Sequence, residues 1–335
     1  MEPSKWTPAD LLQLSGGYWS TCALHAAVKL DLFSLLSENA LTAEELTETG
    51  RVKQRGVSML LNALVALGLL ENRDARFSAT PFAVEFLSTT SPRYLGHIIM
   101  HHHHLMAGWA HLDESVTSGA QLRERMSGGD EPQYRESFLM GMFNLAMLAA
   151  PKIVPVIDLG GRRRLLDLGG GPGTYAIQFC LHNPELFAVV YDLPTTRQFA
   201  ETTIDKFGLA ARIAFNDGNF ITHGIDGIFD VAWLSHILHS EGPEGCEVVI
   251  AKAMAALEPG GLILIQEFIL DDTLDGPLFP ALFSLNMLLG TPEGQSYSEA
   301  QLCGMLTRAG FCNVGRLPVV LPNGAGVIAG TLPCR

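Results

Sequence analysis

The sequence predicts an α/β protein, in which a helical N-terminal domain with a winged helix-turn-helix precedes a doubly wound parallel sheet. From Arg162 onward, apolar runs such as RRLLDLGG, FAVVYDL and GGLILIQEFIL alternate with helical stretches. Runs of this kind indicate strands buried on both faces, hence a parallel sheet covered by helices. Before about residue 150, apolar residues recur at the three and four spacing of helices. A chain of 335 residues accommodates two domains, which we expect to span residues 1–150 and 151–335.

Residues 42–87 have the order of a winged helix-turn-helix. A short helix capped by Thr42 is followed by a turn, a second helix over QRGVSMLLNALVALGLL and two extended pieces around Asn72. This motif often binds DNA. The cations between Arg51 and Arg76 are, however, cancelled by the acidic residues around them, so that no basic face forms. We therefore favour a packing or dimerisation module.

The composition argues against several other classes of protein. The net charge is −13, with 35 acidic and 22 basic residues, which disfavours nucleic acid or an anionic membrane as a partner. The 6 cysteines lie far apart without a CxxC pair, so we expect neither a disulfide framework nor a zinc knuckle, and a reducing cytoplasm fits best. The N-terminus does not resemble a signal peptide, and no run of about 18 apolar residues indicates a membrane span. We expect a small-molecule partner.

A glycine-rich loop follows the first predicted strand of the sheet. In LLDLGGGPGTY, the residues Gly169, Gly171 and Gly173 let the backbone turn tightly and approach a bound nucleoside. The spacing is GxGxG, and Thr174 stands where a dinucleotide-binding loop has its last glycine, which argues against a pyrophosphate ligand. Asp167, just before the glycines, would repel a pyrophosphate and attract a ligand that carries positive charge.

Aspartates also end the next two predicted strands. Asp192 lies about twenty residues beyond the glycine loop, a position from which a carboxylate can accept both hydroxyls of a ribose. Asp217 could accept from the exocyclic amine of adenine, with Phe220 packed on the base. Strand-terminal aspartates also commonly cap the following helix. Three of them in register with a glycine loop nevertheless indicate an adenosine site.

These segments carry a family resemblance. LLDLGGGPG, the VVYDLP strand, the DGNF segment and AALEPGGLILIQEFIL resemble the S-adenosylmethionine (SAM) dependent O-methyltransferases of the acetylserotonin and caffeate type. The resemblance covers residues 165–330, and the winged N-terminal part resembles the dimerisation domain of that family. It implies a homodimer that binds SAM, releases S-adenosylhomocysteine (SAH) and methylates a small molecule. The cofactor-binding residues expected are Asp167, Gly169, Gly171, Gly173, Asp192, Leu193, Asp217, Gly218, Phe220 and Ser235.

His239 is the candidate general base. Methyl transfer from a sulfonium is an in-line displacement, so the protein must position the acceptor and, for a hydroxyl, take its proton. His239 follows the strand that begins near Asp230, at the carboxyl end of the sheet, where doubly wound folds bind ligands. Glu267 emerges from an apolar run and needs a partner, and the resemblance implies that it orients His239. His236 is the rival base, which we interpret as a packed or cofactor-facing residue.

The sequence departs from the family pattern at two places. The family usually reads His-Asp-Trp where this chain has His-Ser-Glu at 239–241, and it often has a second glutamate where this chain has Ser296. Glu293 or Glu299 could shift into that place. A weaker base would still serve an acceptor that loses no proton, so S-, N- or C-methylation remains an alternative to O-methylation.

The acceptor site is predicted from the resemblance and from helical spacing. Asn286 and Met287 resemble family positions that face the acceptor, although Met287 also fits a plain core. Among the histidines of GHIIMHHHH, those at 97, 101 and 104 share one helical face and could bind a metal, line the acceptor pocket or be structural. No acidic or cysteine ligand adjoins them, so we expect no metal. The predicted acceptor-binding residues are Met140, Phe143, Asn144, His236, Asn286, Met287, His101 and His104.

The resulting hypothesis is a SAM-dependent methyltransferase, with O-methylation as the first choice and the helical domain as dimerisation module and acceptor lid. A winged-helix regulator that uses SAM only as an effector is the alternative from another class. It would need a basic recognition helix, which the sequence lacks. A SAM-binding fold does not by itself prove methyl transfer.

Overall fold

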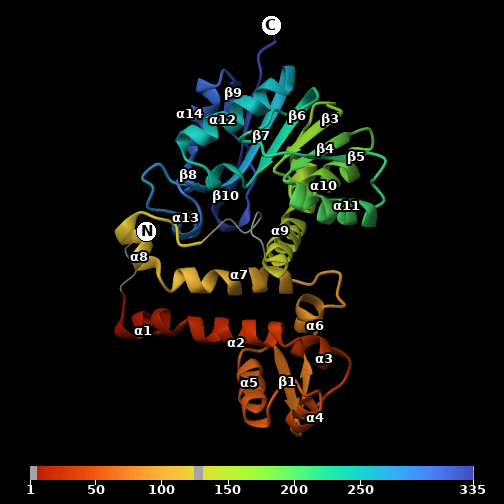
Figure 1. The fold of residues 1–335 in the computed structure, drawn as a ribbon, viewed down its shortest axis with the longest axis vertical. Coiled ribbons are helices and arrows are strands. Elements are labelled where there is room, and N and C mark those ends of the chain that lie inside the picture. Colours follow the sequence, from red (N-terminus) through yellow and green to blue (C-terminus); the bar gives the residue numbers. More distant parts are fainter. Residues whose placement is uncertain (1–5, 124–130, 335) are drawn as a thin grey trace. The chain divides into compact units, whose positions relative to one another are not determined.

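A computed structural model describes residues 6–123 and 131–334 of the chain (Figure 1). Contacts divide the chain into two compact units, Met1–His104 and Leu105–Arg335. The division lies inside helix α7 (Gly96–Trp109), well before the boundary expected at residue 150. The reason is helix α9 (Pro132–Ile153), which packs against α10 (Thr174–His182) and joins the core of the second unit. Helical periodicity alone does not reveal which core a helix joins.

The N-terminal unit contains the predicted winged helix-turn-helix. Thr42 accepts from the main-chain N–H of Glu45 at 3.1 Å, and the Glu45 carboxylate accepts from the N–H of Thr42 at 2.7 Å. This capping box begins the first helix of the motif. The second helix buries Val57, Leu61 and Leu64, which recur at helical spacing, and the two strands pair antiparallel. The elements, in order, are α1 (Pro8–Gly16), α2 (Tyr18–Lys29), α3 (Leu32–Glu38), α4 (Ala43–Thr47), α5 (Gln54–Ala66), β1 (Leu70–Arg73), β2 (Arg76–Ala79), α6 (Pro81–Leu87) and α7.

The C-terminal unit contains the predicted doubly wound sheet, in the strand order β5-β4-β3-β6-β7-β10-β9. The first five strands in that order run parallel, whereas β10 pairs antiparallel with both β7 and β9. The strand order reverses at β3 and β6, and doubly wound folds bind ligands beyond the carboxyl ends of the strands at such a point. The strands are β3 (Arg164–Leu168), β4 (Phe187–Asp192), β5 (Ile213–Asp217), β6 (Phe229–Ser235), β7 (Leu257–Leu270), β8 (Tyr297–Ser298), which pairs with β7, β9 (Cys312–Arg316) and β10 (Ala325–Thr331).

Helices cover both faces of this sheet (Figure 1). Consecutive strand residues alternate between two apolar clusters: Trp233 belongs to the cluster with α10 and α11, and Leu234 to the cluster with α12 and α14. This alternation is the pleat of a strand buried on both sides. The helical elements not yet given are α8 (Leu112–Ser118), η1 (Val154–Val156), η2 (Pro194–Thr196), α11 (Arg197–Lys206), η3 (Leu238–Ser240), α12 (Pro243–Ala255), α13 (Leu278–Gly290), α14 (Glu299–Arg308) and η4 (Pro322–Gly324).

Helix α9, continued by η1, is long and apolar enough to cross a membrane by length and composition. The search for a continuous apolar run missed it, because Asn144, Pro151 and Lys152 interrupt the apolar residues. Ala150 and Ile153 are fully buried in the core of the α/β unit. The core helix of a soluble protein meets the same length and composition test. Because 33% of the apolar window is buried, and Leu145 and Leu148 are each 41% exposed, one face of α9 joins this core.

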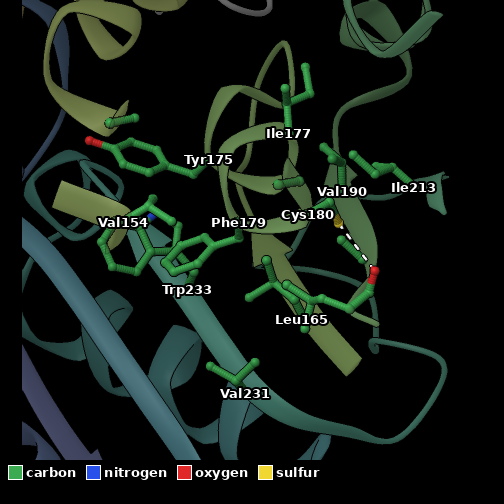
Figure 2. Close-up of a cluster of buried hydrophobic side chains, with 14 of the residues drawn as sticks. Val154, Leu165, Tyr175, Ile177, Phe179, Cys180, Val190, Ile213, Val231 and Trp233 are labelled. Carbon is green, nitrogen blue, oxygen red and sulfur yellow. Dashed lines mark hydrogen bonds between the residues drawn. The ribbon is translucent and has the colours of Figure 1, made fainter. Parts of the chain in front are cut away.

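Trp233 is the largest fully buried side chain in the described part of the core. Figure 2 shows it between Tyr175 and Phe179 of α10, with ring centroids at 4.8 and 5.1 Å. Its indole N–H is buried and has no hydrogen-bond acceptor among the described residues. Trp233 therefore combines a large apolar contribution to stability with an unsatisfied donor, whose burial is costly.

We predict that Trp233→Ala lowers the free energy of unfolding by about 3–5 kcal/mol, because it leaves a large cavity between β6 and α10. Trp233→Phe should cost only about 1–2 kcal/mol, since it also removes the unsatisfied donor. Urea unfolding followed by circular dichroism measures both values. Phe187→Ala, at an exposed position of β4, is the control. Equal losses for the two Trp233 variants would contradict this account.

Candidate active site and cofactor-binding site

The glycine loop follows β3 and has the backbone conformation that only glycine adopts readily. Gly169, Gly171 and Gly173 all have positive φ, at 66°, 54° and 79°. A Cβ on Gly169 would also lie 2.5 Å from Ile237 Cγ2, whereas the Cβ position of Gly171 has no atom within 4 Å. The loop thus packs closely on one side and leaves room at Gly171.

Asp167 supplies a buried carboxyl group beneath this loop. Its Oδ2 accepts from the main-chain N–H of Ala176 at 3.0 Å, while its buried Oδ1 has no hydrogen-bond donor within the described ranges. Burial raises the pKa of Asp167 to about 7, and the nearby charge of Asp192 adds to the effect. An oxygen left in this state suits a cationic donor such as an ammonium group.

Asp192 braces the glycine loop, a role that sequence reasoning missed. Its Oδ2 accepts from the N–H of Gly171 at 2.7 Å, and its Oδ1 accepts from the N–H of Leu193 at 2.6 Å. Burial raises its pKa, and these two bonds oppose the rise. The loop conformation therefore depends on Asp192, and its predicted contact with ribose stays a prediction.

Asp217 forms a bidentate ion pair that the sequence did not indicate. Arg197 Nε donates to Oδ1 of Asp217 at 3.0 Å, and Arg197 Nη2 lies 2.7 Å from Oδ2. The adjacent Gly218 is a position of close approach, because a Cβ there would collide with the Tyr191 hydroxyl. Phe220 is half-buried against the core. The predicted contacts of Asp217, Gly218 and Phe220 with adenine stay predictions, and Arg197 competes for the carboxylate.

Ser235 ends β6 and contacts a buried phenol. Burial raises the pKa of Tyr175 to about 12, and the polar side chains of Gln266 and Ser235 oppose this rise. Ser235 therefore belongs to a polar cluster at the carboxyl ends of β6 and β7, at the edge where the sequence predicted the cofactor.

His239 and Glu267 form a buried pair, here called the His–Glu pair. His239 Nδ1 lies 2.7 Å from Glu267 Oε2, and Oε1 accepts from the N–H groups of Leu238 and His239 at 2.8 and 3.3 Å. Glu267 is only 1% exposed. Burial alone would raise its pKa, but His239 and His236 outweigh burial and hold the pKa of Glu267 well below its usual range. The ionised carboxylate thus assigns the proton of the neutral imidazole to Nδ1 and leaves Nε2 as the basic nitrogen.

His236 is a second imidazole beside the same carboxylate. Its Nδ1 lies 3.6 Å from Glu267 Oε2, and its ring packs on Phe268 with centroids at 4.3 Å. Its φ of 56° is unusual for a residue other than glycine, and its N–H donates to the main-chain oxygen of Gln266 at 2.8 Å. A strained backbone held in this way is common at functional sites. The structure joins His236 to the His–Glu pair, and its predicted contact with the acceptor stays a prediction.

The same three side chains also meet a distance criterion for a metal site. Ligand atoms of His236, His239 and Glu267 all lie within 4.8 Å of one another, and among the described residues no other group does so. The histidines at 97, 101 and 104 are thus not in such a group. Two ligands about 2.1 Å from one ion lie about 2.9–3.4 Å apart. The 2.7 Å between His239 and Glu267 is shorter than that and fits a direct hydrogen bond.

The second acidic residue of the family pattern is not replaced by a neighbour. Ser296 is buried, and its hydroxyl donates to the main-chain oxygen of Pro280 at 2.9 Å. Glu299 pairs with Arg316 at 3.4 Å, and Glu293 packs against the loop before α12. Within residues 6–123 and 131–334, Glu267 is therefore the only carboxylate with a hydrogen bond to His239.

Helix α13 brings further side chains to the His–Glu pair. The ring of Phe283 meets the imidazole of His239 edge-on at 4.8 Å. Asn286, one helical turn further, is buried and accepts from Arg123 Nη2 through Oδ1 at 3.0 Å, and Met287 is buried beside it. Sequence reasoning identified Asn286 and Met287 but missed Phe283 and Arg123. Phe283 could have been found from the sequence, because it lies three residues before Asn286 and therefore on the same face of a helix.

Two of the three α9 residues predicted to bind the acceptor have contacts with the core of the second unit. Phe143 is buried, and its ring packs on Phe207 with centroids at 6.4 Å. Met140 packs on the same core, and the buried Oδ1 of Asn144 has no donor in the described part of the chain. Acceptor binding by these three residues stays a prediction, and the core interpretation of the helix accounts for the first two.

The predicted acceptor residues His101 and His104 belong to the N-terminal unit and are described within it alone. His101 is buried, and burial lowers the pKa of His104. The ring of His103 meets the buried His25 edge-on at 5.5 Å, and burial lowers the pKa of His25 to about 4. These contacts favour the structural interpretation of the histidine run, and its role toward the acceptor stays a prediction.

The site and the fold together define a SAM-dependent methyltransferase. The unpartnered oxygen of Asp167 and the open side of Gly171 fit the ammonium group and the backbone approach of SAM, and the His–Glu pair lies at the same edge of the sheet. The sequence profile of the O-methyltransferase domain matches residues 109–312, and that of the O-methyltransferase dimerisation domain matches residues 12–89. The chain belongs to the O-methyltransferase family, as the resemblance implied.

Relatives with assigned reactions cover nearly the whole chain. The 3-hydroxy-5-methyl-1-naphthoate 3-O-methyltransferase of Streptomyces sahachiroi is 33% identical over 336 residues, which are 98% of this chain and 96% of that protein. The L-tyrosine C(3)-methyltransferase of Streptomyces lavendulae is 30% identical over 92% of this chain and 89% of its own length. The family therefore includes transfer to carbon as well as to oxygen.

Solved structures share the fold. An O-methyltransferase family protein from Burkholderia thailandensis superposes with a TM-score of 0.88 at 28% identity, over 99% of both chains. A structure described as PigF with SAH superposes with a TM-score of 0.88 at 26% identity, over 97% of this chain and 100% of that one. The doubly wound domain and the helical dimerisation domain are thus those of SAM-dependent O-methyltransferases.

We predict that Asp192→Ala weakens SAH binding by about 30-fold, or about 2 kcal/mol, because the variant loses both hydrogen bonds that brace the glycine loop. Asp192→Asn, which keeps one acceptor oxygen, should lose less. Isothermal titration calorimetry measures the affinity, and Asp205→Ala, at an exposed position of α11, is the control. An affinity within twofold of wild type would refute the nucleoside assignment.

We predict that SAH affinity rises with pH up to about 7 and then levels off, because the Asp167 carboxyl must ionise to bind an ammonium group. Below that pH the rise should be about tenfold per unit. Calorimetry from pH 5.5 to 8.5 measures it. Asp167→Asn should bind weakly and without this pH dependence.

Ionisation of the Asp167 carboxyl group, which should strengthen SAH binding, should destabilise the ligand-free protein. Its folded pKa lies above the unfolded value, so the native state binds more protons between pH 4 and 7, and stability falls as pH rises through that window. Asp167→Asn should therefore be more stable than wild type by about 4 kcal/mol at pH 8, and by much less at pH 4. If the difference in stability between Asp167→Asn and wild type were the same at pH 4 and pH 8, Asp167 would not be a buried carboxyl group with a raised pKa.

Proposed function

We propose that this enzyme methylates the hydroxyl group of a small aromatic acceptor and that His239 is its general base. The observation that carries the proposal is the 2.7 Å contact between His239 Nδ1 and Glu267 Oε2. A buried carboxylate on Nδ1 orients the imidazole and stabilises the imidazolium that forms when Nε2 takes a proton.

The side chains around the base favour an aromatic acceptor. The ring centroid of Phe268 lies 4.8 Å from those of both Phe279 and Phe283. The ring of His236 packs on Phe268, and the ring of His239 packs on Phe283. Aromatic walls stack on planar ligands and exclude water. The naphthoate 3-O-methyltransferase relative, by its name, acts on an acceptor of this kind.

The proton and the electrons balance in one displacement. SAM, when bound, supplies a methyl group on a sulfonium whose leaving group is the neutral thioether of SAH. Nε2 of His239 takes the hydroxyl proton as the acceptor oxygen forms its bond to the methyl carbon, and the electron pair of the broken carbon–sulfur bond stays on sulfur. Glu267 keeps the resulting imidazolium paired, and Asn286 holds a polar group of the acceptor.

The N-terminal unit supports a homodimer. Trp6, Leu12 and Trp19 are large apolar side chains that are at least 63% exposed in the single chain, and such a surface marks an association site. The dimerisation profile includes Leu12 and Trp19. A net charge of −13 supports a small-molecule acceptor over nucleic acid.

Transfer to carbon is the second candidate reaction. The tyrosine C(3)-methyltransferase relative and the absence of a second carboxylate at His239 among the described residues favour it. Methylation of an activated ring carbon removes a proton after attack, so a weaker base suffices. The identity of the methylated atom separates this reaction from O-methylation.

We predict that His239→Ala lowers kcat for a hydroxyl acceptor by about 10²–10³-fold, while SAH affinity stays within threefold of wild type. Glu267→Gln should lower kcat by about tenfold or more, because the amide keeps the acceptor oxygen for Leu238 but loses the charge that supports the imidazolium. The assay uses deuteriomethyl-labelled SAM with a panel of hydroxylated naphthoates and phenols, read by mass spectrometry. His182→Ala, an exposed histidine of α10, is the control.

Full turnover by His239→Ala would rule out base catalysis at this residue. Nuclear magnetic resonance of the labelled methyl group identifies the atom that carries it. A methyl group on carbon would replace O-methylation by the second candidate. SAH binding without any labelled product, from this panel and from pooled metabolite extracts, would favour a regulator that senses SAM.

A further inference from the structure

Arg123 is a partly buried cation in the C-terminal unit that has no carboxylate partner among the described residues. Its Nη2 donates to the main-chain oxygen and to Oδ1 of Asn286, at 3.1 and 3.0 Å. Its Nε is buried and has no acceptor in the described part of the chain. Burial lowers the pKa of the Arg123 guanidinium, and no carboxylate among the described residues opposes this effect. A charge in such a place is unfavourable until an anion joins it.

Other arginines of the same unit show what is missing at Arg123. Five of them are at least one third exposed, so water already solvates them, and yet each of the five is paired with a glutamate or aspartate. These residues are Arg163, Arg164, Arg197, Arg308 and Arg316. Arg162 and Arg212 also lack a carboxylate partner among the described residues, but main-chain oxygens accept from both. Arg123 differs from these two because its buried Nε has no acceptor in the described ranges.

The backbone and a glycine hold Arg123 in place. The N–H groups of Leu122 and Arg123 both donate to the main-chain oxygen of Leu289, at 3.0 and 3.1 Å. A Cβ on Gly290 would lie 2.5 Å from the guanidinium carbon. Gly290 ends α13 without a positive φ, so its missing side chain makes room for the guanidinium and is not required by the backbone.

The polar groups of Arg123 and Asn286 that this arrangement leaves without acceptors among the described residues are hydrogen-bond donors. Because Oδ1 of Asn286 accepts from Arg123, the Nδ2 hydrogens of that amide point away from the guanidinium. Nε and Nη1 of Arg123 form no hydrogen bond within the described residues. Such a set matches a group that only accepts hydrogen bonds, and a planar guanidinium matches a carboxylate best.

This set of donors lies near the base. Asn286 follows Phe283 by one helical turn, and the Phe283 ring contacts the imidazole of His239 at 4.8 Å. At 1.5 Å per residue, Asn286 and Gly290 lie about 5 and 10 Å along α13 from Phe283. That distance is comparable to one or two fused aromatic rings.

We propose that Arg123 and Asn286 form a carboxylate subsite, and that the acceptor is an aromatic acid whose carboxylate binds there while its reacting atom lies at His239. The proposal rests on the proposed function for the identity of the reaction. The subsite itself is defined by binding, and binding can be measured without methyl transfer.

The experiment measures binding of acids that have no hydroxyl group to the SAH-loaded enzyme. Benzoate, 1-naphthoate and 2-naphthoate are each compared with the corresponding carboxamide by calorimetry at pH 7.5. At least one acid should bind the wild-type enzyme about tenfold or more tightly than its amide, because only the acid forms a charge-assisted pair. Arg123→Gln should abolish the difference, and Arg123→Lys should keep part of it, since ammonium keeps the charge but not the planar fork.

Arg308→Gln, which removes a surface arginine of α14, is the matched control and should keep the wild-type difference. Thermal unfolding of each variant verifies that it is folded, and the wild-type comparison of acid with amide requires no variant. If no acid binds more tightly than its amide, or if Arg123→Gln keeps the difference, the proposal is wrong. A loss of SAH affinity in Arg123→Gln without acid discrimination would assign Arg123 to the carboxylate of SAM and would also overturn it. Failure of the labelled-methyl assay with intact acid discrimination would reject the proposed function and leave the subsite.

Discussion

Glu267 is the group on which the geometry of the active site depends. Its carboxylate ends an apolar stretch of β7 and is almost completely buried, so it must receive hydrogen bonds from the protein. It receives them from two main-chain N–H groups of η3 and from the imidazole of His239. One charge therefore sets the path of the loop, the orientation of the ring and the nitrogen that remains basic. The second imidazole, His236, lies close enough to add to this effect.

The predicted cofactor site also contains a buried carboxyl group, but there the pKa is raised, whereas the pKa of Glu267 is lowered. Asp167 is also buried, but a single N–H group supports it, so burial and the nearby charge of Asp192 raise its pKa. Asp192 is supported by the loop that it braces. One strand-end carboxyl group is thus left for the ligand to complete, whereas the other is used to shape the glycine loop. This division explains why similar aspartates at neighbouring strand ends have different roles.

Arg123 adds an incomplete cation to the acceptor side. The protein provides it with an amide oxygen, a main-chain oxygen and the space above Gly290, but with no negative charge from the described residues. Helix α13 of this chain presents the ring of Phe283 and the amide of Asn286 in successive turns, and Gly290 leaves room for the guanidinium of Arg123.

The family resemblance implied that Glu267 pairs with His239. The α/β class, the winged N-terminal motif, the glycine loop and the separate candidates His239 and Glu267 could be predicted from the residues themselves. These features depend on local periodicity, on positive φ at glycine, and on polar residues at the ends of apolar strands, all of which act over a few residues. Only the tertiary structure decided that α9 belongs to the second unit, that Asp217 pairs with Arg197, and that neither Glu293 nor Glu299 replaces the second acid. Likewise, 163 residues separate Arg123 from Asn286. Contacts of this kind depend on how strands and helices pack, and packing between distant segments leaves no pattern in a local window of sequence.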